Sequence, residues 1–537
     1  MTASGETLSY RRLRAPRESG TQLIEPPLEA AAALVADNQR RWSQQTHDSH
    51  GLSLAGLRER ARAELLEAAW HYTSQYCDAA RPQQVDRILM AGHQPSLFHT
   101  GVWFKNFVLG RLAQQQGAVA INLQIDSDTI KGASLRVPGG SIVAPTAHQI
   151  PLDEPSGEIP YEERPIVDAA RFESFGSRAA EEISPLVPDP LLKDFWPHVV
   201  ARGRATNHLG RALSQARHVV ERDWGLSTLE LPQSHVCALP SFHRFAVHLL
   251  AHLERFREIH NQALAEYRRA NRVRSAHHPV PELERDGDWL EAPLWVWTSA
   301  EPRRRRLFAT RQSGKLLLND RAGWQTELPL RDDADQHDAV EALAELERSG
   351  IKLRTRALLT TLFARLVLCD AFLHGIGGAK YDELTDRILE RFFGVDPPGF
   401  LIASATLHLP IPREPVADDG LRRMEHDLRA LRYHPESYVE AAGVAAEAAN
   451  LVAEKRRWLA VEPTRETARR RCHAIRRANE NMQPLLADYR RELLVARDRL
   501  ALRLRAEAVL SSREYAFCLF PEKMLRDFML EIPHNTS

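Results

Sequence analysis

Short apolar runs alternate with longer amphipathic stretches early in the chain. Residues 88–91 are apolar, residues 102–116 place apolar side chains at helical spacing up to Gly117, and residues 118–125 alternate as in a strand. A strand, a helix and a second strand in this order predict a βαβ unit, with parallel strands and a right-handed crossover.

The same pattern returns after residue 350. An apolar helix is expected over residues 357–370, then a strand over 371–374, a glycine loop at Gly375–Gly378, an amphipathic helix over 380–393 and a strand over 400–407. We therefore predict an α/β fold with a Rossmann-like parallel-sheet core, built from residues 86–155 and 331–412.

Five further regions are expected around this core. They are a helical lead-in (residues 1–85), a mostly helical connecting region (156–288), a small β-meander insert (289–330), a helical coiled-coil arm (413–510) and a C-terminal docking segment (511–537). In the meander, apolar runs are separated by turn residues. Arg303–Arg306 falls in one of these expected turns, either as the solvated tip of a hairpin or as an anion contact.

The arm carries an apolar seam at spacings of three and four residues. Its members are Cys472, Ile475, Asn479, Met482, Leu486, Tyr489, Leu493, Ala496 and Leu500, a pattern typical of a coiled coil. Pro484 lies inside the seam and predicts a kink or a break into two helices. The seam needs a partner, either helices between residues 420 and 458 of the same chain or a second subunit, and we expect a homodimer.

The charge balance narrows the possible partners. The chain has 71 Lys and Arg against 71 Asp and Glu, a formal net charge of zero, which argues against general nucleic-acid binding. No apolar run reaches the roughly 18 residues of a membrane span, and the start lacks the apolar segment of a signal peptide. The five cysteines form no CxxC pair and indicate no disulfide framework. We expect a cytoplasmic protein that acts on small-molecule substrates, without nucleic-acid or membrane partners.

The loop after the first strand holds the densest group of polar side chains. It contains His93, Gln94, His99, Thr100 and Gly101 and is followed by Lys105. Parallel sheets bind ligands at the carboxyl ends of their strands, and the start of the next helix can hold an anion through its N–H groups. The two histidines could act as general acid and base or donate to an anion. Alternatively, Pro95 and Gly101 shape the turn and the histidines cap that turn.

Two carboxylates follow the next strand. Asp126 and Asp128 lie at the same expected edge of the sheet as His93. A pair at this spacing can share a hard cation such as Mg²⁺ or bind an amino group, although it also occurs in ordinary turns. Lys131 follows and could neutralise the pair. We expect His93, His99 and Asp126 to converge on one cleft.

The glycine loop is the third candidate site. Its residues are Gly375, Gly377, Gly378, Lys380 and Tyr381, with Arg354 and Arg356 ahead of the preceding helix. Closely spaced glycines before a helix can hold an anion, and an arginine can bind a carboxylate or phosphate with two nitrogens. The loop is not a P-loop, because no GxxxxGK[ST] occurs in the chain. It could equally be a tight turn between a strand and a helix.

Together, the three loops resemble the bacillithiol-biosynthesis cysteine-adding enzymes. The resemblance runs through Gly92, Gln94, Phe98, Thr100, Gly101, Lys105, Asp126, Asp128, Gly375, Gly377, Gly378 and Tyr381. It implies a Rossmann-like core, a coiled-coil arm that can dimerise, and an activity that joins cysteine to glucosaminyl-malate. The chain differs from the family pattern at His93, where a glutamine is usual, and at Gly377, Gly378 and Lys380, where the family carries a proline and an acidic residue.

The leading hypothesis is a ligase that forms an amide bond between a cysteine-like amino acid and an amino sugar or similar amine, in the synthesis of a low-molecular-weight thiol. A histidine would take the proton of the attacking amine, and Asp126 or Asp128 would bind the ammonium group or Mg²⁺. The sequence fixes no cofactor; ATP or ADP with Mg²⁺ is the candidate set. Two alternatives stay open: a metal-dependent nucleotidyl- or glycosyltransferase that uses Asp126 and Asp128, and a non-catalytic dimeric scaffold of the same fold.

Overall fold

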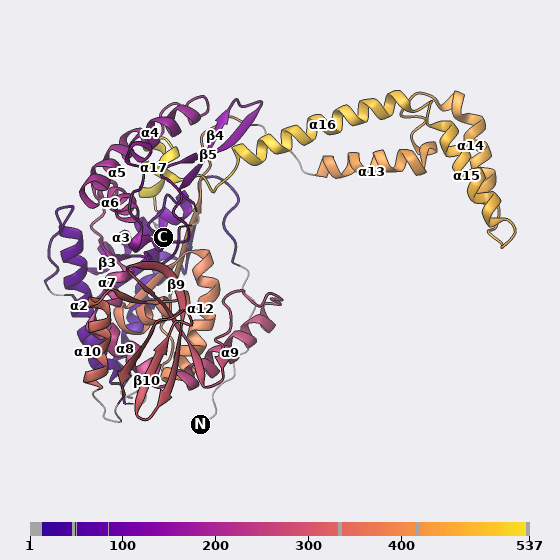
Figure 1. The fold of residues 1–537 in the computed structure, drawn as a ribbon. Helices are drawn as coiled ribbons and strands as arrows, with labels where there is room; N and C mark the ends of the chain where they lie inside the picture. Colours follow the sequence, from indigo (N-terminus) through magenta and orange to yellow (C-terminus); the bar gives the residue numbers. More distant parts are fainter. Residues whose placement is uncertain are drawn as a thin grey trace. The chain divides into compact units, whose positions relative to one another are not determined.

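The computed structural model describes residues 13–45, 49, 51–83, 85–130, 132–330, 336–413 and 419–532. The chain divides into two compact units: Met1–Val137, His148–Leu409 and Arg513–Ser537 make up the first, and Pro138–Ala147 with Pro410–Ser512 the second. Helices and strands are mixed, as the sequence predicts (Figure 1). Among the described residues, no helix has both the length and the apolar composition that a membrane crossing needs.

A six-stranded sheet forms the centre of the first unit. Its strands lie in the order β1 (Thr21–Glu25), β14 (Leu401–Thr406), β13 (Ala371–His374), β2 (Ile88–His93), β3 (Val119–Gln124) and β6 (Leu229–Pro232). Neighbouring strands from β14 to β6 are parallel, and β1 pairs antiparallel with β14. The predicted parallel α/β core is therefore confirmed. Two strands were not predicted: β1, in the lead-in expected to be helical, and β6, a four-residue strand that ends in proline.

Both predicted crossings from strand to helix to strand are present. Helix α3 (Thr100–Gln116) links β2 to β3 and ends at Gly117, whose φ of 59° forms a left-handed cap that glycine favours. Helix α12 (Ile376–Ile388) follows β13 and leads to β14. Each helix begins earlier than predicted. Gly377 and Gly378 therefore lie in the first turn of α12 and not in a loop.

A second, antiparallel sheet is larger than the expected meander. Its order is β11 (Gln325–Pro329), β10 (Lys315–Asn319), β9 (Glu301–Gln312), β8 (Trp289–Thr298) and β12 (Ile351–Thr355), and β7 (Arg285–Asp286) pairs with β8. The prediction that Arg303–Arg306 lies in a turn is wrong, because the chain turns at residues 299–300 and these arginines lie in β9. Strand β12 carries Arg354 into this second sheet by pairing with β8, although residues 331–412 were expected in the core.

Helices surround the two sheets. They are α1 (Leu28–Gln44), α2 (Leu54–Ser74), α4 (Ala169–Ile183), α5 (Leu192–Thr206), α6 (Leu209–Asp223), α7 (Gln233–Cys237), α8 (Pro240–Ala251), α9 (Leu253–Ala270), α10 (His337–Arg348) and α11 (Ala357–Phe363), and a hairpin joins β4 (Ser134–Gly140) to β5 (Pro145–Pro151). One apolar core takes buried side chains from both sheets, including Met90 of β2 and Leu294 of β8. The shared core fixes the second sheet against the first.

The C-terminal segment docks on the first unit, as predicted. Phe517 is fully buried, and its ring centroid lies 4.2 Å from that of Trp103. Its backbone N–H donates to the carbonyl of Phe98 over 3.0 Å. Helix α17 (Glu522–Leu530) follows and places the ring of Phe528 beside that of Phe104. The segment therefore covers helix α3 on the side of its aromatic residues.

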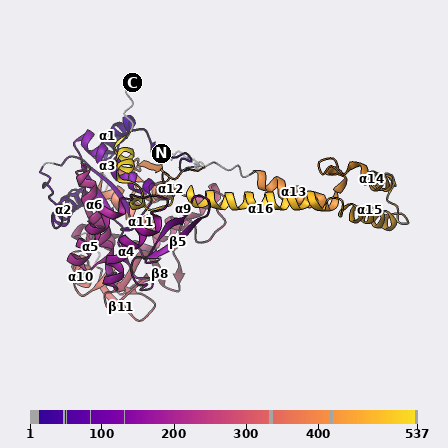
Figure 2. The ribbon, with the colours of Figure 1, turned by 90° about the horizontal axis from the view of Figure 1, so that it is seen from above.

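The second unit is helical, and its helices pair with one another. It contains α13 (Asp419–Tyr433), α14 (Ala445–Ala460), α15 (Ala468–Met482) and α16 (Ala487–Leu510). Helix α14 lies beside α15, and α13 beside α16 (Figures 1 and 2). The break predicted at Pro484 is confirmed, because it falls between α15 and α16. A small core around Leu431, Val439 and Leu486 closes the bundle.

The continuous seam expected in the arm is not present as one stripe. Leu486 and Met482 are buried, but Cys472 is exposed, and the amide of Asn479 donates to the carbonyl of Tyr433 over 3.1 Å. The seam is split because its two halves belong to helices that pack on different partners. The intramolecular alternative, pairing with helices between residues 420 and 458, accounts for Leu486, which packs in the same small core as Leu431.

Candidate functional site

A cavity of about 690 Å³ lies in the first unit, where parallel strands of the core sheet end. It is lined by His93 at the end of β2, Ser127 after β3, Gln233 after β6 and His374 at the end of β13. From β2 the chain moves outward through β3 to β6, whereas β13 and β14 lie on the other side of β2. Ligands of open parallel sheets bind at such a reversal of strand order. The cavity is therefore the strongest candidate for the active site.

The sequence-predicted residues divide into two groups at this cavity. Those that line it are His93, Gln94, Lys105, Asp128, Arg356, Gly375, Gly377, Gly378 and Tyr381; His99, Thr100, Gly101, Asp126, Arg354 and Lys380 do not. The cleft expected to unite His93, His99 and Asp126 therefore contains only the first of them. Lys131 lies outside the described residues.

The β2 side of the cavity carries two buried basic residues. Nδ1 of His93 is buried without a hydrogen-bond partner in the described part of the chain. Burial, with help from the nearby charges of Arg217 and Lys105, lowers the pKa of His93 well below its usual range, so the ring is neutral. Nζ of Lys105 donates to the carbonyl of Gly92 over 2.8 Å, and burial lowers the pKa of this lysine to about 8.

The start of α3 is closed and offers no site for an anion. Nδ1 of His99 accepts a hydrogen bond from the N–H of Gly101 over 3.0 Å, and Nε2 lies 3.7 Å from a carboxylate oxygen of Glu514. A Cβ at Gly101 would lie 2.3 Å from the carbonyl oxygen of Ala405, so the backbone of this first turn is pressed against β14. The alternative in which the histidines cap the turn holds for His99, which is the N-cap residue of α3.

The two carboxylates after β3 face different surroundings. Asp126 is buried and accepts hydrogen bonds from the N–H of Ser234 over 2.9 Å and from its hydroxyl over 2.5 Å. Asp128 lines the cavity, where it pairs with Arg304 at 3.0 Å and accepts from the amide of Gln94 at 3.0 Å. The two aspartates thus do not form a shared cation site. No group of three or more His, Cys, Asp or Glu suited to a metal ion occurs among the described residues.

Two arginines lie against one tryptophan of the second sheet. The guanidinium carbons of Arg304 and Arg356 are 5.0 Å and 4.7 Å from the ring centroid of Trp295, and all three residues line the cavity. Arg356 also pairs with Glu291 at 2.5 Å. Among the described lining residues, Asp128 is the single carboxylate against Lys105 and these two arginines. Asp128 and Glu291 offset the two arginines, so the remaining positive charge of the lining comes from Lys105.

The β13 side holds a histidine–aspartate pair that sequence reasoning missed. Nε2 of His374 lies 2.6 Å from Oδ2 of Asp382, and the same oxygen accepts from Arg365 over 2.9 Å. Burial raises the pKa of Asp382, but His374 and Arg365 outweigh it and hold the pKa well below its usual range. A Cβ at Gly378 would lie 2.8 Å from Nδ1 of His374, so this nitrogen faces the first turn of α12. Nε2 makes the close contact with Asp382, which leaves Nδ1 as the nitrogen that can accept a proton.

The first turn of α12 lies open at the cavity. Gly375 is the N-cap residue and supplies no side-chain cap, and Gly377 and Gly378 line the cavity. The first N–H groups of a helix have no partner within the helix, and together they attract an anion. Tyr381 lines the cavity one turn further on, whereas Lys380 is exposed and points elsewhere. The groups that could bind an anion here are therefore the first backbone N–H groups of α12, and not a glycine loop ahead of the helix.

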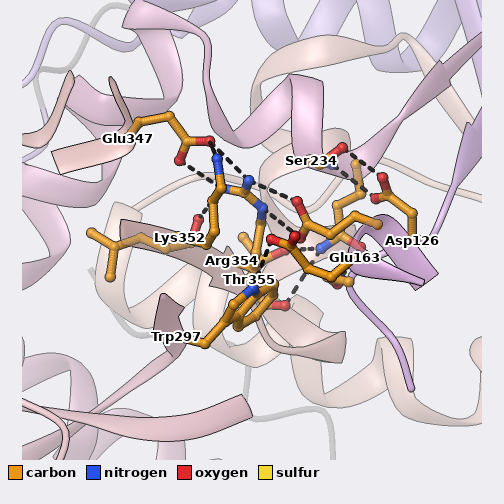
Figure 3. A network of polar contacts seen from close by, with 12 residues as sticks. Asp126, Glu163, Ser234, Trp297, Glu347, Lys352, Arg354 and Thr355 are labelled. Atoms are coloured by element: carbon orange, nitrogen blue, oxygen red, sulfur yellow. Dashed lines mark hydrogen bonds and ion pairs between the residues drawn. The ribbon is translucent and has the colours of Figure 1, made fainter. Parts of the chain in front are cut away.

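Arg354 stabilises the wall of the cavity without lining it. Its guanidinium binds Glu162 and Glu347 through four contacts of 2.8–2.9 Å, and it is 1% exposed. Figure 3 shows Arg354 between Glu347 on one side and Asp126 and Ser234 on the other. Burial raises the pKa of Glu162 to about 7, while Arg354 opposes that rise. This network joins β12 to the segment after β5 and so positions the loop of Asp126 and Asp128.

The residues that sequence reasoning missed had weak local signals. His374 stands at the carboxyl end of an expected strand, which is a place for ligand contacts, but Asp382 becomes its partner only when α12 folds back. Arg304 was expected in a solvated turn. No family model matches the chain, and no curated protein matches it either.

Proposed function

We propose that the chain is an amide-forming, ligase-like enzyme with the 690 Å³ cavity as its active site. Within this class, it adds a cysteine-like amino acid to an amino sugar or a similar amine in the synthesis of a low-molecular-weight thiol, in the cytoplasm. The single observation that carries the proposal is the pair of His374 and Asp382, 2.6 Å apart, beside the open first turn of α12. A base next to an anion site is what amide formation from an activated acid requires.

The proposed reaction assigns one role to each group. A free acid must be activated, and we propose ATP with Mg²⁺ as the co-substrate: the carboxylate oxygen attacks the γ-phosphorus, and ADP leaves with the bridging oxygen, which gives an acyl phosphate. The amine nitrogen attacks the acyl carbon and forms the N–C bond, and phosphate leaves with the electron pair of the broken C–O bond. Nδ1 of His374 takes the amine proton, and Asp382 stabilises the imidazolium. The first-turn amides of α12, with Arg304 and Arg356, hold the anionic group.

Binding and turnover together test the proposal. Calorimetry of the full chain with cysteine, glucosaminyl-malate and ATP with Mg²⁺ should detect binding, and mass spectrometry should detect the amide product. His374→Gln should lower the rate about 10²–10⁴-fold and change binding only a few-fold, because the ring acts as a base. The matched control is Lys380→Gln, an exposed residue on the same helix that should retain the full rate. Full activity of His374→Gln, or no binding of any of the three compounds, would contradict the proposal.

The metal-dependent transferase is the weaker candidate. It requires Asp126 and Asp128 to hold one cation, but Asp126 is engaged by Ser234 and only Asp128 lines the cavity. The non-catalytic scaffold is weaker as well, because a folded scaffold gains nothing from a buried neutral His93 with an unpartnered nitrogen. Activity that depends on Asp126 and on added Mn²⁺, without amide product, would favour the transferase.

A homodimer through the helical arm remains part of the proposal. Leu486 is buried inside the second unit, but Val495 and Leu502 on α16 are 54% and 64% exposed and lie seven residues apart on one face. Light scattering of the full chain should report a dimer. Leu502→Glu should then give a folded monomer, whereas Arg490→Glu, an exposed residue on a different face of the same helix, should leave the dimer intact.

A further inference from the structure

Helices α14 and α15 of the second unit enclose a groove of about 980 Å³ with an unusual lining. Helix α14 contributes Glu454 and Trp458, and α15 contributes Arg469, Arg470, His473, Arg476, Arg477 and Glu480. The contacts that hold α13 to α16 and close the small core of this unit use none of these side chains. The groove is therefore a surface that the fold of the unit does not require.

The arginines lie on a single face of α15. Arg469, His473, Arg476 and Glu480 are spaced by four, three and four residues, and Arg470 and Arg477 are spaced by seven. Residues at these spacings share one side of a helix. At about 1.5 Å per residue, the stretch from Arg469 to Glu480 is roughly 17 Å long. The face can thus contact several charges of an extended partner at once.

Most of these guanidinium groups form no ion pair in the described part of the chain, although Glu454 and Glu480 line the same groove. Within the range that the structure describes, Arg469, Arg470 and Arg477 form no ion pair, and Arg476 pairs only with the exposed Glu480 at 2.8 Å. Arg471 is different, because it donates to the backbone carbonyls of Trp458 and Leu459 and so ties α15 to the end of α14. One arginine shapes the groove, and its neighbours remain free to bind a ligand.

The charge excess is local. Residues 452–482 contain nine Lys and Arg against four Asp and Glu, although the whole chain balances at 71 to 71. Clustered like charges repel one another, so this excess lowers the stability of the fold unless a polyanion neutralises it. We expected no nucleic-acid partner because the net charge of the whole chain is zero, but that value does not reflect the local charge of this groove.

We propose that the groove between α14 and α15 binds single-stranded nucleic acid, with the arginine face of α15 on the phosphates and Trp458 against a base. Arginine suits phosphate because its planar fork can donate two hydrogen bonds to it. A half-buried tryptophan beside a row of cations is the combination that single-strand binding sites use. A membrane surface fits less well, because the face that carries the arginines offers no apolar row to enter the lipid.

Fluorescence anisotropy with the full chain tests the proposal, with labelled 16-nucleotide oligo(U) and oligo(dT) as probes. Wild type should bind, and raising the salt from 50 to 200 mM should weaken binding about 50-fold, because four phosphate contacts give a slope near −2.8 on logarithmic axes. The triple variant Arg469→Gln, Arg470→Gln, Arg477→Gln should bind at least tenfold more weakly, with a slope lower by about 2. Trp458→Ala should lose at least fivefold, and Trp458→Phe should restore most of that loss.

A charge-matched control separates the groove from general charge. Arg490→Gln, Arg499→Gln, Arg505→Gln removes the same charge from exposed positions of α16 and should change the affinity less than twofold. Circular dichroism should show the same helix content for all variants. No binding by wild type at 50 mM salt, or an equal loss in both triple variants, would overturn the proposal. If the chain bound phosphatidylserine vesicles more tightly than the oligonucleotides, the ligand would be a lipid surface. If it bound polyglutamate more tightly, and Trp458→Ala did not change that affinity, the ligand would be an acidic protein.

Discussion

The two strand-to-helix crossings at the centre of the core sheet differ in what they leave open. After β2, His99 caps the first turn of α3, and Gly101 closes it against the carbonyl of Ala405. After β13, Gly375 supplies no side-chain cap, and the first turn of α12 faces the cavity. The loop with more polar residues is therefore the one whose helix start is already satisfied. A helix start whose N–H groups have no side-chain cap is therefore a better candidate for ligand binding than a loop that is merely rich in polar residues.

The histidines at the two strand ends differ in the same way. His93 is buried beside cations and stays neutral, so it suits hydrogen bonding to a ligand. His374 has the carboxylate of Asp382 behind it, which stabilises the protonated ring that a general base becomes. The β2 side is thus suited to binding and the β13 side to proton transfer.

Asp382→Asn should produce the largest change in stability. It removes a buried carboxylate from both Arg365 and His374, and loss of one partner in a buried pair destabilises by about 3–5 kcal/mol. Asp386→Asn is the matched control, since Asp386 binds the same arginine at 2.7 Å but is 33% exposed, and about 1 kcal/mol is expected. Denaturant unfolding of both variants measures the difference. Equal losses would mean that Asp382 is no more important than any ion pair on α12.

A pair of glycine substitutions tests the closed and the open helix start. Gly101→Ala should destabilise by about 1–3 kcal/mol, because its Cβ would lie 2.3 Å from a backbone oxygen that cannot easily move. Gly377→Ala meets nothing within 4 Å and should stabilise by about 0.5–1 kcal/mol through its helix propensity. Calorimetric melting of the two variants would give shifts of opposite sign. A stable Gly101→Ala would show that the start of α3 can open.

Sequence alone predicted the elements that depend on local periodicity and missed those that depend on distant partners. Helix α3 and its flanking strands follow from spacing, because the pattern and the Gly117 stop lie within one segment. Strand β6 has four residues and becomes a strand only beside β3, and β12 joins β8 across about fifty residues of intervening chain.

The candidate site shows the same limit. Topology correctly placed Asp128 and His93 at one edge, since parallel strands end together. It could not tell that Asp126 turns toward Ser234, because successive side chains point in different directions and the choice depends on tertiary partners. The pair of His374 and Asp382 needs the folded α12.

His93→Gln should flatten the loss of stability in acid. The pKa of His93 is lowered in the folded protein, so below the unfolded value of about 6.5 the unfolded chain binds a proton that the folded chain does not. Stability from the neutral ring is complete above that pH and is lost as the pH falls, by at most about 1.4 kcal/mol per pH unit. Unfolding free energies at pH 7 and pH 5 should therefore differ less for the variant. An unchanged difference would mean that His93 is protonated in the fold.

Asp128→Asn should have the smallest effect on stability. Its carboxylate is 37% exposed and pairs with Arg304, and pairs of this kind contribute about 0–1 kcal/mol. Asparagine can still accept from Gln94, so the link between the two strand ends persists. The effect on ligands should be larger, because Arg304 loses its counter-charge and remains beside Trp295. Affinity for inorganic phosphate, measured by calorimetry, should therefore rise a few-fold. The control is Glu301→Gln, which removes an exposed carboxylate from β9, the strand of Arg304, and should leave the phosphate affinity unchanged. A fall in phosphate affinity would mean that Asp128 orders the anion site instead of opposing it.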